Sequence, residues 1–123
     1  MSEIFLPNLF TCVPFTTTIN PHHKRASAES AARVNSYNLL ADHKRAHFIC
    51  SSVELLMAYA YPSASYEDFR TICDYANLVF VFDGISDDQD GPNALATAET
   101  CLKALNGEKC ERSDSPLYKL FFE

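Results

Sequence analysis

The stretch ANLVFVFDGISDDQDG (Ala76–Gly91) places a continuous apolar run directly before four aspartates. A line at three- to four-residue spacing, typical of one face of an α-helix, runs through Phe69, Ile72, Ala76, Phe80, Asp83 and Asp87. Carboxylates near a helix C-terminus face the negative end of the helix dipole, which costs roughly 0.3–1 kcal/mol each when they are exposed. The cluster is therefore unfavourable for stability alone and favours a bound cation.

Two interpretations of these aspartates stay open. In the first, they are a solvated helix end followed by a loop. In the second, Asp83 and Asp87 share one helix face at i and i+4 and hold Mg²⁺, which takes few protein carboxylates and completes its octahedron with phosphate oxygens. Asp88 and Asp90 then flank the site, and the apolar residues below it on the line are candidate cavity lining: Phe80, Ala76 and Ile72.

A calcium loop is excluded by the spacing. If Gly91 is aligned with the invariant glycine of an EF-hand, Ser86 and Thr97 fall at the first and twelfth positions. Those two positions require acidic ligands.

Length and charge restrict the class of protein. The chain has 123 residues, 47% of them apolar, which suffices for one domain with a real core. The net charge is −6, and residues 61–123 carry twelve acidic against five basic side chains. Nucleic acids and anionic membranes need clustered Lys and Arg, so neither is an expected partner. No apolar run is long enough to span a bilayer.

The residue patterns predict an all-α chain behind an irregular strap at 1–20. Asn20 as N-cap and Pro21 at the first position predict a helix over 22–41, followed by a polar break at 42–45. A second helix is expected over 46–61, with Pro62 ending it and a core stripe at Ile49, Val53, Leu56 and Ala60.

The second half of the chain predicts three further helices. Ser65 and Asp68 resemble a capping box that opens the helix carrying the aspartates. The next helix begins at Gly91-Pro92 and ends before Gly107, and Ser115-Pro116 opens a last one over 117–122. The expected apolar positions of the helix after Gly91 are Leu95, Ala98, Leu102 and Leu105.

With these features the sequence resembles the class I terpene synthases, specifically the sesquiterpene cyclases of basidiomycete type. Their aspartate-rich motif, D-(D/E/N)-x-x-D, corresponds to residues 83–87, DGISD. The resemblance covers nearly the whole chain from about Leu6. The matching segments are NPHHKRASAES (20–30), VNSYNLLADHKRAHFICSSVELLMAYAYPSASYEDFR (34–70), DYANLVFVFDGISDDQDG (74–91) and DSPLYKLF (114–121).

The resemblance implies the N-terminal part of the class I terpenoid synthase helical bundle, with residues 21–123 an incomplete synthase domain. It implies that Asp83 coordinates Mg²⁺ bound to a prenyl diphosphate, with Asp87 at the last motif position. The implied reaction is metal-dependent loss of diphosphate from farnesyl diphosphate, followed by cyclisation to a sesquiterpene. The implied cofactor is Mg²⁺, and the aromatic residues beneath it would stabilise the carbocation.

Two departures from the family pattern bear on activity. Gly84 stands where the family carries Asp, Glu or Asn, and residues 91–123 contain no N-D-x-x-S-x-x-x-E motif for the second half of the metal site. We therefore expect little or no cyclase turnover from these 123 residues alone. The alternative is a non-catalytic helical relic or an interaction module without metal chemistry.

The remaining candidate groups have simpler interpretations. His43 and His47 lie at i and i+4 but lack a suitably spaced third zinc ligand, so solvated histidines are expected. Lys44 and Arg45 are expected to be surface charge. The five cysteines contain no C-x-x-C pair and predict reduced, mostly buried thiols of a cytoplasmic protein.

Overall fold

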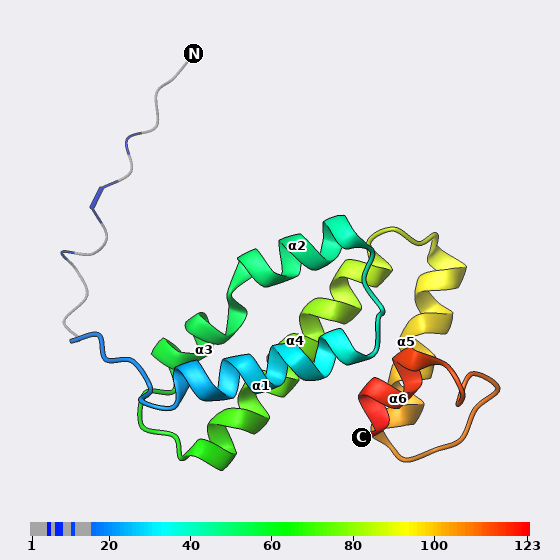
Figure 1. The fold of residues 1–123 in the computed structure, drawn as a ribbon. Helices are drawn as coiled ribbons and strands as arrows, with labels where there is room; N and C mark the ends of the chain where they lie inside the picture. Colours follow the sequence, from blue (N-terminus) through cyan, green and yellow to red (C-terminus); the bar gives the residue numbers. More distant parts are fainter. Residues whose placement is uncertain (1–4, 6, 9–10, 12–15) are drawn as a thin grey trace.

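The computed structural model describes residue 5, residues 7–8, residue 11 and residues 16–123. These residues form six α-helices and no strand, which confirms the predicted all-α class (Figure 1). Most of the predicted strap at 1–20 lies outside the described residues, and residues 16–20 have no regular structure. The helices are α1 (His23–Ser36), α2 (Asp42–Ser51), α3 (Val53–Ala60), α4 (Tyr66–Ser86), α5 (Gly91–Leu105) and α6 (Pro116–Phe122).

Helix α4 is the centre of the arrangement. It packs most extensively against α1 and α3, and it also contacts α2 and α5, while α6 lies on α5 (Figure 1). Two groups of buried apolar side chains hold these helices together. One contains Val34, Leu40, Phe48, Val81 and Leu120, and the other contains Ala26, Ala58, Phe69 and Cys73.

The predicted capping signals of the second half are confirmed. Ser65 Oγ accepts from the backbone N–H of Asp68 at the start of α4, and Ser115 Oγ accepts from that of Tyr118 at the start of α6. Helix α5 ends in a Schellman motif, in which Gly107 N–H donates to Ala104 C=O and Glu108 N–H donates to Lys103 C=O. Gly107 adopts φ +71°, a conformation that side-chain-bearing residues rarely adopt.

The prediction for the first helix is wrong at both ends. His22, and not Asn20, is the N-cap of α1, and the helix ends at Ser36, before Asn38 with its positive φ of 55°. Asn tolerates this left-handed conformation better than most residues. Asn20 is buried, and its side chain has local and distant partners: its Oδ1 accepts from His22 N–H at 2.9 Å, as a capping side chain does, and its amide donates to Tyr61 C=O and Ala64 C=O.

The single helix predicted over 46–61 is in fact two helices, α2 and α3. The polar break predicted at 42–45 is helical and forms the first turn of α2. The helical conformation is interrupted at Ser52, which adopts φ 48°. Just before it, Ser51 Oγ donates to Phe48 C=O at 2.7 Å. Serine hydroxyls that bond nearby backbone in this way compete with helical hydrogen bonds. The break changes the inward face, so that Ile49 and Leu56 are 57% and 61% exposed while Phe48 and Ala58 are buried.

The apolar face of α5 also differs from the prediction. Leu95, Leu102 and Leu105 are exposed, and the face that packs inward carries the smaller side chains of Thr97, Thr100, Cys101 and Ala104. Small residues let a helix approach its neighbour closely, whereas the exposed Leu102 and Leu105 line a pocket together with side chains of α4 and α6.

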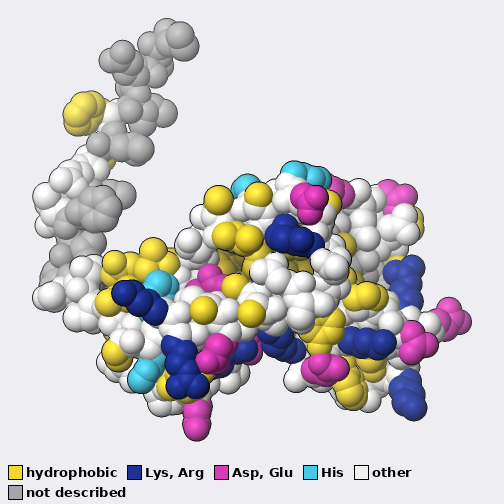
Figure 2. Space-filling model, in the orientation of Figure 1, with side chains coloured by type: hydrophobic (Ala, Val, Ile, Leu, Met, Phe, Trp, Pro, Cys, Tyr) yellow, Lys and Arg dark blue, Asp and Glu magenta, His cyan; other side chains and the backbone are white. Residues whose placement is uncertain are grey.

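The surface mixes charge and exposed apolar groups. On the face drawn in Figure 2, acidic and basic side chains are interspersed, with hydrophobic side chains exposed between them. Among the described cysteines, Cys73 and Cys101 are buried, Cys110 is half-buried and Cys50 is exposed, so only two follow the prediction of buried thiols. None of the described helices combines the length and apolar character that a bilayer crossing requires.

Candidate metal and diphosphate site

The last turn of α4 carries Asp83 and Asp87 in helical register. Asp87 N–H donates to Asp83 C=O at 3.0 Å, so the helical geometry continues to the C-cap residue Asp87. Residues four apart in this geometry lie on the same helix face. Both side chains are exposed and line one pocket of about 430 Å³ between α4 and α2.

Acidic side chains line one wall of this pocket, and apolar and basic side chains line the other. Helix α4 supplies Phe80, Asp83 and Gly84, and Asp87 and Asp88 follow at its end. Leu40, which precedes α2, and the side chains of α2 form the opposite wall: His43, Lys44, His47, Phe48 and Ser51. The volume is within the range of small-molecule sites, and the pocket combines an apolar floor with a few polar groups, as such sites do.

The four aspartates have different partners. Asp88 forms an ion pair with Lys44, and Asp90 is the N-cap of α5, where its Oδ1 accepts from Asn93 N–H at 3.0 Å. Within the described residues, no hydrogen bond or ion pair reaches the carboxylates of Asp83 and Asp87. The cluster therefore separates into two aspartates with structural roles and two that are free to bind a cation.

Lys44 is the residue that sequence reasoning missed. It was expected to be surface charge, but its side chain is only 25% exposed, and its ammonium also donates to Gly84 C=O. It reaches the pocket because Asp42–Arg45 form the first turn of α2, where a polar break was predicted. A basic residue near a helix C-terminus also offsets the unfavourable dipole there.

Of the three residues predicted to line the cavity, only one lines this pocket. Phe80 lines the pocket and is 44% exposed, whereas Ala76 is buried, Ile72 is half-buried, and neither lines this pocket. The geometric reason is that four-residue steps advance by about 40° beyond a full turn at 3.6 residues per turn. From Ile72 to Phe80 the line therefore rotates by about 80° around the helix.

The donor set of the pocket restricts which metal ion it suits. The described residues contain no group of three or more His, Cys, Asp or Glu side chains placed to hold a metal ion. A zinc centre at His43 and His47 is therefore not supported. Mg²⁺ differs because it binds through one or two carboxylates and takes its other oxygens from phosphate and water, which suits Asp83 and Asp87.

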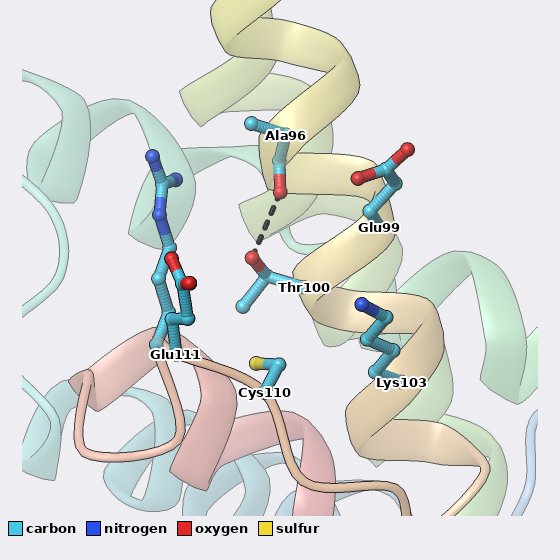
Figure 3. A pocket seen from close by; sticks show the side chains of 7 residues that line it. Ala96, Glu99, Thr100, Lys103, Cys110 and Glu111 are labelled. Atoms are coloured by element: carbon cyan, nitrogen blue, oxygen red, sulfur yellow. Dashed lines mark hydrogen bonds between the residues drawn. The ribbon is translucent and has the colours of Figure 1, made fainter.

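A second pocket of about 400 Å³ lies between α5 and the loop before α6 (Figure 3). Figure 3 shows Thr100 on α5, with Cys110 and Glu111 of the loop across from it; Thr100 Oγ1 donates to Ala96 C=O at 2.8 Å. The acidic and basic side chains that line this second pocket are Glu99, Glu111, Lys103 and Arg112. No aromatic residue lines this pocket, and its two carboxylates come from different elements, Glu99 from α5 and Glu111 from the loop, whereas Asp83 and Asp87 lie four residues apart on one helix.

A helical unit with an unpaired Asp pair above an aromatic-lined pocket matches what the class I terpene synthase resemblance implied. Comparisons with known proteins agree with this class. The chain is 45% identical over 104 residues to the bifunctional terpene synthase Agr4 of Cyclocybe aegerita, which covers 85% of this chain and 30% of that protein. It is 36% identical over 85 residues to a Delta(6)-protoilludene synthase of Stereum hirsutum, which covers 69% of this chain and 23% of that protein.

A third relative, from Coprinopsis cinerea, is 51% identical over 103 residues, which cover 84% of this chain and 30% of that protein. Its name is linoleate 10R-lipoxygenase COP4, so the family assignment depends on the terpene synthase names of the others. No family model matches the chain. By sequence, the chain is therefore similar to one part of basidiomycete sesquiterpene synthases, and it spans about 30% or less of the length of these curated relatives.

Proposed function

We propose that this chain carries the aspartate half of a magnesium and prenyl-diphosphate site, and that within a complete synthase it serves the ionisation and cyclisation of farnesyl diphosphate. The observation that supports this most directly is the free carboxylate pair, Asp83 and Asp87, on the wall of a pocket that Phe80 and Phe48 also line. Similarity to sesquiterpene synthases supports the substrate class.

The roles proposed for the side chains follow from their chemistry. Asp83 and Asp87 would hold the ion, and a bound Mg²⁺ would stabilise the negative charge that develops on the leaving diphosphate. The rings of Phe80 and Phe48 and the side chain of Leu40 would exclude water from the organic part of the substrate. Aromatic faces also attract cations, which suits the carbocation left after diphosphate departs.

Gly84 supports the alternative of a non-catalytic relic, because it removes a polar side chain beside the proposed metal site. The relic and the synthase differ in a measurable way. A relic binds neither Mg²⁺ nor diphosphate at the pocket, whereas a synthase segment binds both even where turnover needs further residues.

A binding measurement on the full 123-residue chain tests the proposal. Isothermal titration with inorganic pyrophosphate in excess Mg²⁺ should give saturable binding that is absent with EDTA. Asp83→Ala should weaken it at least about tenfold, since a charged ligand contact is lost. Asp114→Ala, on the loop before α6, is the matched control and should bind like the wild type. Binding that is equal in the wild type and in Asp83→Ala would overturn the proposal.

A chimera tests turnover. The matching 104-residue segment of the Cyclocybe aegerita synthase is replaced by the segment of this chain. With farnesyl diphosphate and Mg²⁺ the chimera should form terpene, and its Asp83→Ala version should be slower by about 100-fold, the scale of losing one electrostatic contact to the transition state. The isolated chain should form little product, and terpene formation by it at the rate of the chimera would contradict that expectation.

A further inference from the structure

Lys44 is tied to the two residues that directly follow the proposed metal ligands. Its ammonium pairs with the carboxylate of Asp88 and donates to the backbone carbonyl of Gly84. Gly84 follows Asp83, and Asp88 follows Asp87. The Lys44 side chain and the carboxylate pair line the same pocket at the C-terminal end of α4.

The charge of Lys44 is unusual for its pocket. Among the described residues that line the pocket it is the sole Lys or Arg, opposite a wall that carries Asp83, Asp87 and Asp88. One Mg²⁺ offsets the two negative charges of Asp83 and Asp87 and leaves nothing to balance a diphosphate, which carries several more. An anion in this pocket gains most from the one ammonium available on its wall.

One N–H donor of the Lys44 ammonium also remains unused in the described part of the structure. A lysine carries three N–H donors, and Lys44 uses two of them on Asp88 and Gly84. These two contacts restrict a side chain that is otherwise flexible, so less conformational entropy is lost when a third partner binds.

We propose that Lys44 is a diphosphate-binding residue of this pocket, which contacts phosphate oxygens directly while Asp83 and Asp87 contact them through the metal. The inference rests on the proposed function. It differs from a purely structural role, in which Lys44 would only hold α2 against the last turn of α4.

Two titrations on the full chain separate these roles, one with Mg²⁺ alone and one with inorganic pyrophosphate in excess Mg²⁺. Lys44→Met should weaken pyrophosphate binding about tenfold, the scale of one lost charged hydrogen bond, and should leave Mg²⁺ binding unchanged or tighter because a nearby positive charge is gone. Lys44→Arg should keep most of the pyrophosphate affinity. Lys24→Met, on the exposed side of α1, is the matched control and should change neither titration.

Three results would overturn the inference. Pyrophosphate binding by Lys44→Met that equals the wild type excludes a direct contact. Parallel loss of Mg²⁺ and pyrophosphate binding, with a lower unfolding midpoint, shows a structural role. A wild-type chain that does not bind pyrophosphate in Mg²⁺ refutes the proposed function itself, and this result is distinct from the first two.

Asp88→Asn provides a test of opposite sign if Lys44→Met does not fold. Removing the carboxylate frees the ammonium from its ion pair and takes one negative charge from the pocket wall. Pyrophosphate in Mg²⁺ should then bind about threefold tighter. Unchanged or weaker binding in a folded Asp88→Asn chain would overturn the inference.

Discussion

Asn77 of α4 donates both hydrogens of its side-chain amide, one to Ser30 Oγ of α1 and one to Glu54 Oε1 of α3, each at 2.8 Å. Ser30 Oγ in turn donates to Asp74 Oδ1 at 2.6 Å. Asn77 and Ser30 are fully buried and Glu54 is nearly so. The amide of Asn77 thus connects α4 to two neighbouring helices, α1 and α3, which are the helices that α4 packs against most extensively.

Replacing Asn77 should therefore be costly. Asn77→Ala leaves the buried carboxylate of Glu54 without this donor, and we expect the free energy of unfolding to fall by about 2–4 kcal/mol. Urea denaturation followed by far-UV circular dichroism measures the change. Asn106→Ala, at the exposed C-cap of α5, is the matched control and should stay within about 0.5 kcal/mol of the wild type. Equal effects of the two substitutions would contradict the role given to Asn77.

Gly84 should be replaceable at a gain in stability. A Cβ added there meets nothing within 4 Å, and the residue lies inside α4, where glycine costs roughly 0.5–1 kcal/mol relative to alanine. Gly84→Ala should therefore raise the free energy of unfolding by about that amount. Gly107→Ala is the informative comparison: it also has open space, but its φ of +71° should make alanine destabilising. Thermal melts that shift in the same direction would refute this argument.

The sequence predicted the helices best where local signals act alone. The predicted start signals Ser65, Gly91-Pro92 and Ser115-Pro116 lie at the start of α4, α5 and α6, and Gly107 follows the end of α5. These signals depend on a few adjacent residues, so their outcome does not require knowledge of the tertiary structure. The acidic turn of α4 was located for the same reason.

The sequence failed where a side chain has a distant partner. Asn20 is of a residue type that is common at N-caps, but its side-chain amide also donates to backbone carbonyls some forty residues away, after α3. Lys44 was predicted to be a surface charge because lysine usually is, but it forms an ion pair with Asp88 across the pocket. The break at Ser52 was not predicted, so of the stripe expected over 46–61 Val53 is buried but Ile49 and Leu56 are exposed. On α5 the leucines were expected inside, but the buried face carries Thr97 and Cys101. No local pattern reports such contacts.

The long-range role of Asn20 gives a prediction that separates it from helix capping. Asn20→Ser keeps a good N-cap residue but is too short for the carbonyls of Tyr61 and Ala64, so it should destabilise the chain nearly as much as Asn20→Ala does. We expect about 2–3 kcal/mol for either, from two lost hydrogen bonds at a buried position. Urea midpoints compare the two variants. Wild-type stability in Asn20→Ser would show that the bond from His22 N–H to Asn20 Oδ1, and not the two distant carbonyls, accounts for the contribution of Asn20.

The two buried thiols should make stability depend on alkaline pH. Burial raises the pKa of Cys101 to about 11, and burial together with the nearby charges of Glu54 and Asp74 raises the pKa of Cys73 to about 11. The folded chain thus favours the neutral thiols: their contribution is complete below the unfolded pKa near 9 and is lost as pH rises through 11. At pH 8, a thiol reagent should modify the exposed Cys50 quickly and the two buried thiols only on unfolding.

The matched variant Cys101→Ala separates this effect from the titration of lysines and tyrosines in the same range. It lacks one raised thiol pKa, so its urea midpoint should fall less between pH 8 and pH 10.5 than the wild-type midpoint does. Cys50→Ala, which removes an exposed thiol, is the matched control and should keep the wild-type pH dependence. If Cys101→Ala and Cys50→Ala lose stability in parallel with the wild type, the buried thiol does not favour its neutral form. Burial at position 101 would then stabilise the chain through packing alone, without a pH-dependent part.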